Sequence, residues 1–212
     1  MLRVQNLATA GFPPVSTDVA AGQWVTLGHA DPPGLLAAIA GDAQAGVGHG
    51  RVLLAGQDLS HQPASRRARA GLATCPGRLP DLPGLRVMDV LLVARSESLR
   101  GLSWRAALGS RQARAALADA EADARALAAR LGIGDWVDAQ AVGLPPQVAA
   151  RADLVRALVG APRALVWAVP ATGADGHATA RPGAAPTLAD ALAAEQKRLG
   201  MAVLAVEPTL RR

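Results

Sequence analysis

Few side chains in this sequence suit covalent or metal chemistry, and they lie far apart along the chain. The single cysteine, Cys75, is followed by a proline and has no histidine or other base near it, so a buried or loop thiol is favoured over a nucleophile. The only lysine is Lys197, which excludes lysine chemistry from the first 196 residues. No second metal ligand stands three or four residues after any of the four histidines, which are His29, His49, His61 and His177. The sequence therefore predicts neither a thiol enzyme nor a metal site.

One loop has the glycine content of an anion-binding loop. It reads Gly28-His-Ala-Asp-Pro-Pro-Gly34 and joins a predicted strand at 23–27 to a predicted short helix at 35–40. Such loops cradle phosphates with backbone amides and a following lysine. This loop has no lysine, arginine, serine or threonine, two prolines remove amide donors, and Asp31 adds negative charge. We therefore keep two interpretations of it: a relic of a phosphate loop, or a plain turn with a solvated His29.

The elements that position this loop alternate between strands and helices. Apolar runs predict strands at 2–4, 23–27, 51–54, 164–169 and 201–206. Helical periodicity and breakers predict helices at 35–40, 110–131, 146–159 and 188–199. This alternation is typical of an α/β architecture with a mainly parallel sheet.

The composition favours a soluble, cytoplasmic domain. The chain has 212 residues, 50% apolar residues and a formal charge of +5 from 22 basic and 17 acidic residues, which excludes a disordered or disulfide-stapled chain. No apolar run is long enough for a membrane-spanning helix, and the N-terminus lacks a signal-peptide pattern. The arginine excess accompanies a general Ala, Gly and Pro excess, so we expect Arg66, Arg67 and Arg69 to form a solvated face and expect no nucleic-acid partner.

Five stretches, taken in order, carry a resemblance to a known family. They are residues 1–12, 50–73, 82–94, 160–175 and 200–208. Together they resemble the ATP-binding subunit of ABC transporters, particularly of branched-chain amino acid importers, over nearly the whole chain. The resemblance implies an α/β, P-loop NTPase-like ABC ATP-binding domain over residues 1–212, with a mainly parallel sheet and a helical subdomain at about 85–158.

The residues that touch nucleotide in that family are replaced here. At the phosphate loop the resemblance aligns Gly28, Asp31, Pro32, Pro33, Gly34, Leu35 and Leu36. Gly77 takes the position of the glutamine-loop Gln, and the signature motif reads Leu144, Pro145, Pro146, Gln147. Ala168 and Val169 stand where the family has its Mg²⁺-binding Asp and catalytic Glu, and Pro208 stands at the switch His. The resemblance thus implies the architecture of an ATPase without its phosphoryl-transfer residues.

The resemblance implies a degenerate subunit of an importer for branched-chain amino acids or similar small polar solutes. The replaced residues imply no cofactor. ATP and Mg²⁺ would be the ligands only if the degenerate site has kept the ability to bind nucleotide. The expected partners of this subunit are permease subunits and a second, intact ATP-binding subunit in a heterodimer, at the inner face of the cell membrane. Two alternatives stay open: an active ATPase with non-standard ligands, and a decayed relative with no function of its own.

Overall fold

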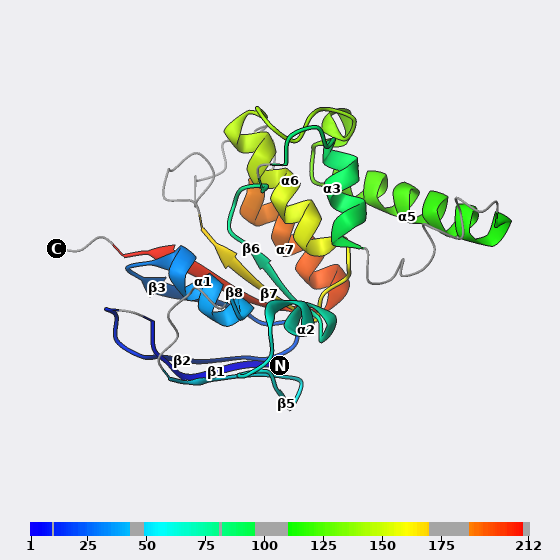
Figure 1. Ribbon diagram of the computed structural model, residues 1–212. Helices are drawn as coiled ribbons and strands as arrows, with labels where there is room; N and C mark the ends of the chain where they lie inside the picture. The colour runs from blue at the N-terminus through cyan, green and yellow to red at the C-terminus, as the bar shows by residue number, and fades with distance from the viewer. Residues whose placement is uncertain (10, 43–48, 81, 96–109, 170–186, 210–212) are drawn as a thin grey trace. The chain divides into compact units, whose positions relative to one another are not determined.

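The structure is a computed structural model that describes residues 1–9, 11–42, 49–80, 82–95, 110–169 and 187–209 (Figure 1). It divides into two compact units. Unit 1 comprises Met1–Gly77 and Ala161–Arg212, and unit 2 comprises Arg78–Gly160. Each unit is described by itself below.

A parallel four-stranded sheet lies at the centre of unit 1. Its strands, in spatial order, are β3 (Trp24–His29), β8 (Ala202–Pro208), β7 (Ala164–Ala168) and β6 (Leu72–Cys75). All five residues of β7 are buried, as expected for a central strand of a parallel sheet. The prediction of a parallel sheet in an α/β fold is confirmed, although β6 was not predicted.

A second sheet of unit 1 is antiparallel. Its order is β2 (Val15–Val19), β1 (Leu2–Leu7), β4 (Arg51–Leu54) and β5 (Gln57–Asp58). The sequence predicted β1 and β4 as short strands but missed β2. Alternation of buried Leu2 and Val4 with partly exposed Arg3 along β1 is typical of a sheet with one buried face.

One cluster of buried residues joins the two sheets to helix α1 (Pro32–Ala40). The helix contributes Leu35, Leu36 and Ile39, and every second residue of β7 and β8 faces the same cluster. In register, Ala164 lies beside Ala202 and Val166 beside Leu204, so this face of the parallel sheet is uniformly apolar and buried. The core therefore fixes the position of α1 against the sheet.

Two further helices belong to unit 1, α2 (Ala64–Arg69) and α7 (Leu188–Leu199). The prediction of a helix at 188–199 is confirmed. Thr187 and Asp190 form a capping box at its start, and Gly200 ends it with φ of 63°. The Gln196 amide nitrogen donates to the carbonyl oxygens of Gly22 and Met201, which ties α7 to the segments that precede β3 and β8.

The described part of unit 2 is helical. It contains α3 (Val87–Ala94), α5 (Arg111–Arg130), the 3₁₀ turn η1 (Gly134–Trp136) and α6 (Pro146–Leu158). The predicted helices at 110–131 and 146–159 are confirmed, whereas α3 was not predicted. On α5 the buried side chains are small, mainly alanines, with Leu127 as the largest.

Among the described residues, no helix is both long enough and apolar enough to span a membrane.

Candidate functional site

The strands of the parallel sheet end together at one edge, where most of the predicted site residues meet. We define this carboxyl edge as residues 28–34, 75–77, 168–169 and 207–209, which surround the ends of β3, β6, β7 and β8. In open α/β sheets, ligands bind outside the carboxyl ends of the strands. The carboxyl edge is therefore the candidate site.

At this edge the Asp31 side chain caps α1. Its Oδ1 accepts a hydrogen bond from the Gly34 backbone N–H at 3.0 Å, and its backbone oxygen accepts from the Leu35 N–H at 3.1 Å. Pro32 and Pro33 occupy the first two helical positions, where proline is favoured because no amide is needed there. The helix dipole favours an anion at the amino end of α1, and the Asp31 carboxylate already occupies that place.

The loop between β3 and α1 is shorter than the sequence predicted. Gly28 and His29 belong to β3, and Pro32 and Gly34 belong to α1, so the interpretation of Gly28 and Gly34 as turn glycines is wrong. Instead, the side chain of another residue comes close to the Cα atom of each glycine. A Cβ at Gly34 would lie 2.8 Å from Asp31 Cγ, and a Cβ at Gly28 would lie 2.6 Å from Thr209 Cγ2.

The prediction of a solvated His29 is also wrong, because this side chain is only 5% exposed. Its Nδ1 lies 2.8 Å from the Asp31 carbonyl oxygen and 3.1 Å from the Asp31 backbone nitrogen. The ring of Phe12 packs on the imidazole at a centroid distance of 5.2 Å. Phe12 is the only phenylalanine, and neither its spacing nor its neighbours in the sequence pointed to this contact.

Two of the predicted site residues on α1 face the core rather than the edge. Leu35 is fully buried and Leu36 is 3% exposed, and both pack in the cluster between the two sheets. They hold α1 in place and offer no polar group to a ligand.

Four other predicted positions lie at the ends of β6, β7 and β8. Gly77 follows β6 with φ of 85°, a left-handed conformation that favours glycine. Ala168 is 6% exposed, and the Val169 N–H donates to the Val206 carbonyl oxygen. Pro208, the last residue of β8, pairs in register with His29. The structure therefore brings these positions to the edge that also holds Asp31.

The signature-like residues belong to unit 2, at the start of α6. Pro145 is the N-cap residue and Pro146 the first helical residue, and no side chain caps this helix. Leu144 is half-buried, and Gln147 is exposed. The two prolines remove amide donors from the first turn.

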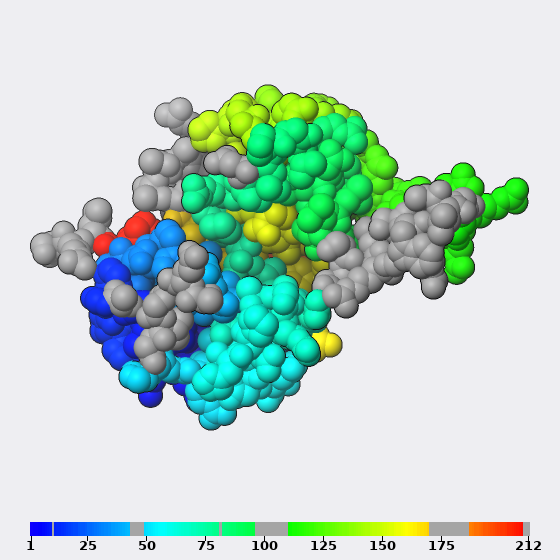
Figure 2. Space-filling model, viewed as in Figure 1, coloured from blue at the N-terminus to red at the C-terminus, as the bar shows by residue number. Residues whose placement is uncertain are grey.

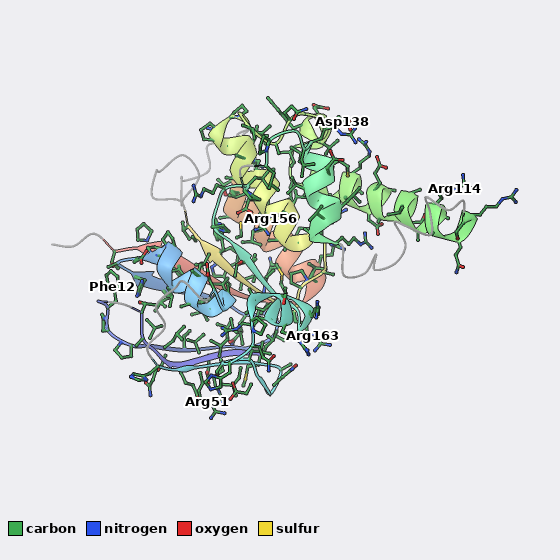
Figure 3. The ribbon with its side chains drawn as sticks, in the orientation of Figure 1. Phe12, Arg51, Arg114, Asp138, Arg156 and Arg163 are labelled. Atoms are coloured by element: carbon green, nitrogen blue, oxygen red, sulfur yellow. The ribbon has the colours of Figure 1, made fainter. Side chains whose placement is uncertain are left out.

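Sequence reasoning missed a buried ion pair on α6. The Asp153 side chain is fully buried, and its Oδ1 accepts a hydrogen bond of 2.7 Å from Arg156 Nε (Figure 3). Its Oδ2 accepts from the Arg78 backbone N–H at 3.1 Å. The pair thus fixes the first residue of unit 2 against α6, and its i,i+3 spacing was the only signal in the sequence.

The arginine cluster on α2 differs from the predicted solvated face. Arg66 and Arg69 are exposed, but Arg67 is 5% exposed. Its guanidinium donates to four backbone carbonyl oxygens at 2.8–3.1 Å, those of Ser60, Gln62, Ala38 and Ile39. Arg67 is therefore a structural clamp at the carboxyl end of α1.

The carboxyl edge does not fit a magnesium triphosphate. It carries two carboxylates, Asp31 and Glu207, and neither an arginine nor a lysine. A P-loop binds the phosphates with free amides and a lysine and holds Mg²⁺ with a hydroxyl and an acidic side chain. Here the Gly34 amide already has a carboxylate partner, and the β7 end offers only Ala168 and Val169.

The described residues contain no group of three or more His, Cys, Asp or Glu side chains that could hold a metal ion. The thiol of Cys75 is buried at the end of β6.

No protein-family model matches the sequence. No curated protein matches it either.

Solved structures with the same fold are found at low sequence identity. An ATP-binding cassette of an ABC transporter in its ADP conformation is 19% identical, with a TM-score of 0.65, covering 99% of this chain and 82% of that one. A nucleotide-free ATP-binding cassette is 20% identical, with a TM-score of 0.66, covering 97% and 80%. CbiO1 from Clostridium perfringens, part of the ABC transporter complex CbiONQ, is 15% identical, with a TM-score of 0.60, covering 97% and 77%. The chain thus has the fold of the ATP-binding cassettes of ABC transporters.

Proposed function

We propose that this chain is a subunit of an ABC transporter that keeps the ATP-binding-cassette fold and does not itself hydrolyse ATP. The observation that carries the proposal is the Asp31 carboxylate on the amino end of α1, within the fold whose solved members are ATP-binding cassettes. A carboxylate on that helix end repels a triphosphate and takes the amide that would bind it.

The family resemblance supports the finer proposal of an importer for branched-chain amino acids or similar small polar solutes. Its partners are then permease subunits and an intact ATP-binding subunit that supplies hydrolysis for the pair. CbiO1, which shares the fold, is part of a multi-subunit complex, and this supports a role within a complex at the inner face of the membrane.

The Asp31 carboxylate repels a triphosphate and occupies the Gly34 amide, and no lysine or arginine of the carboxyl edge offsets its charge. We therefore expect titration calorimetry of the purified chain with Mg-ATP to give no binding heat at millimolar nucleotide. The matched control is an intact ATP-binding cassette titrated in the same buffer. Saturable binding with stoichiometry near one would contradict the proposal and favour an ATPase with non-standard ligands.

The partner proposal has a separate test. Affinity purification of the tagged chain from its native cells should bring down a permease and a second ATP-binding subunit in defined stoichiometry. A chain that remains monomeric and associates with neither would refute the transporter role and favour a decayed relative.

A further inference from the structure

We propose that the amino edge of the parallel sheet, opposite the carboxyl edge, binds an acidic segment of a protein partner. The inference goes beyond the transporter role and does not depend on it. We define the basic face by five exposed residues on three segments: Arg66, Arg69, Arg163, Lys197 and Arg198.

Hydrogen bonds and packing bring these three segments together where the strands begin. The N–H groups of Arg163 and Ala164 donate to the Gly71 carbonyl oxygen at 2.9 and 3.1 Å, directly after α2. The Ala202 N–H donates to the Arg163 carbonyl oxygen at 3.0 Å, just after α7. Figure 1 shows α2 and the end of α7 where the arrows of β6 and β7 start. The three segments of the basic face are therefore neighbours at the starts of β6, β7 and β8.

The side chain of Arg163 lies over the backbone of Gly71. A Cβ at Gly71 would be 3.0 Å from Arg163 Cγ, so the glycine leaves room for the aliphatic stem of the arginine. The guanidinium lies beside α2 (Figure 3), and α2 belongs to the exposed cyan part of the surface in the space-filling view (Figure 2). Arg163 is thus supported along its stem and presents its charge to solvent.

Acidic neighbours oppose only part of this charge. Glu195 is 4% exposed and pairs with Arg198 at 2.7 Å. Asp58 pairs with Arg51 at 2.6 Å, outside the basic face. Among the described residues, no ion pair is formed by Arg66, Arg163 or Lys197.

The two edges of the sheet therefore have opposite charge. The carboxyl edge has two carboxylates and no arginine or lysine, whereas segments 64–71, 161–163 and 197–201 at the amino edge carry five exposed basic residues and no carboxylate. Such an asymmetric distribution draws an anionic partner to the amino edge and away from the edge where this fold class places its ligands.

The chemistry of the basic face favours an acidic protein segment. Its segments, residues 64–71, 161–163 and 197–201, contain no aromatic residue for base stacking, and none of the exposed large hydrophobic residues lies on them. Single-stranded nucleic acid and membrane surfaces normally use such groups. The face covers the starts of three strands, which span about 10 Å, and an extended segment of about three residues covers this distance. Arginine forks bind carboxylates two bonds at a time.

The test measures the binding of a fluorescein-labelled oligoglutamate peptide to the full chain by fluorescence anisotropy. We expect binding at low ionic strength that weakens steeply with salt, and an affinity loss of about tenfold or more in the double variant Arg66→Glu, Arg163→Glu. The matched control is Arg111→Glu, Arg114→Glu on α5, which changes the net charge equally and should alter affinity by less than about twofold.

Circular dichroism melts establish that both double variants remain folded. Equal loss of binding in the two variants would overturn the proposal, because the attraction would then follow net charge alone. Tighter binding to phosphatidylserine vesicles or to oligothymidine than to the peptide would also overturn it.

Discussion

At the scale of single residues, Arg67 shows how a buried charge can serve the fold. Its guanidinium donates to carbonyl oxygens at the end of α1, which carry the negative end of the helix dipole. Burial lowers the pKa of Arg67 from its ordinary value, although the neighbouring Asp58 opposes this effect. An arginine stays charged in such an environment, so its four hydrogen bonds must offset the cost of burial.

A substitution at Gly41 tests whether Arg67 fixes the end of α1. It is the C-cap of α1 with φ of 82°, and a Cβ there would lie 2.5 Å from Arg67 Nε and 2.9 Å from the Gln62 carbonyl oxygen. We expect Gly41→Ala to lower the free energy of unfolding by about 2 kcal/mol or more, because it adds crowding of Arg67 to the strain of a left-handed alanine. Urea unfolding measures the change.

The matched control is Gly200→Ala at the C-cap of α7. Its φ is 63°, and a Cβ there meets nothing within 4 Å, so we expect only the backbone cost of about 1 kcal/mol. Equal losses of the free energy of unfolding in the two variants would show that the Arg67 side chain moves aside without cost and does not fix the end of α1.

The sequence was informative for residues whose role follows from their type. Asp31, Pro32 and Pro33 were predicted to oppose phosphate binding, and the structure places all three at the amino end of α1. His29 and Arg67 were misjudged because a polar residue at the end of a strand or on a short helix gives no sign of its burial. Burial of these side chains depends on Phe12 and on the end of α1, which lie far away in the sequence.

At the scale of elements, predictions succeeded where the pattern was long or wholly apolar. Helices α5, α6 and α7 and strands β7 and β8 were found because three or more turns, or five or more apolar residues, leave little ambiguity. The missed strand β2 has polar residues at its centre and lies at a sheet edge, and α3 is an eight-residue helix with an almost continuous apolar run. Periodicity is uninformative for both, and tertiary contacts decide their structure.

In unit 2 a charge network joins α5 to the segment after η1. Both oxygens of Asp138 accept hydrogen bonds of 3.1 Å from Arg125, which also pairs with Glu121 at 2.9 Å. Arg86 adds a contact of 3.6 Å to Asp138. The hydrogen bonds from Arg125 hold the pKa of Asp138 below its usual range, and Asp138 and Glu121 raise the pKa of Arg125.

The depressed pKa of Asp138 predicts a pH-dependent contribution to stability. A carboxyl with a lowered pKa in the folded state stabilises above its unfolded pKa of about 4, and this contribution disappears as the pH falls through the folded value. We therefore expect Asp138→Asn to be less stable than the wild type at pH 6.5 and the difference to shrink below about pH 4, as measured by urea unfolding.

Asp135→Asn is the control for this effect. Asp135 is exposed on η1 and forms no ion pair among the described residues. The free energy of unfolding of Asp135→Asn should therefore stay close to that of the wild type at both pH values. A deficit in Asp138→Asn that persists unchanged at pH 3 would assign the effect to something other than the carboxylate charge.

At the scale of the whole molecule, a fold shared with ATP-binding cassettes is combined with site residues that do not suit a triphosphate. The apolar pattern of β7, β8 and α1 determines the fold, and it does not constrain the residues at the strand ends. Fold similarity at about 20% identity therefore supports the architecture, and the function has to be argued from the edge residues.

The order of strands makes β8 the element on which the parallel sheet depends. It is the only described strand that pairs with β3, and it also pairs with β7. We expect a variant that ends at Gly200 to lose cooperative urea unfolding, because removal of β8 leaves β3 without its described partner and leaves one edge of β7 unpaired.

A variant that ends at Thr209 keeps all of β8 and should unfold at the wild-type midpoint. Cooperative unfolding of the shorter variant with an unchanged dependence on urea would show that the sheet forms without β8.

The pairing of β3 with β8 also has a consequence for biosynthesis. Trp24 lies beside Val203, so the two strands are separated by most of the chain when a ribosome produces it. During translation β3 must wait for nearly the entire polypeptide before its only described neighbour emerges, and its uncharged edge is meanwhile open to wrong pairing. The yield of recombinant protein should therefore depend strongly on chaperones that bind nascent chains. This dependence should be stronger than the stability of the folded protein alone suggests.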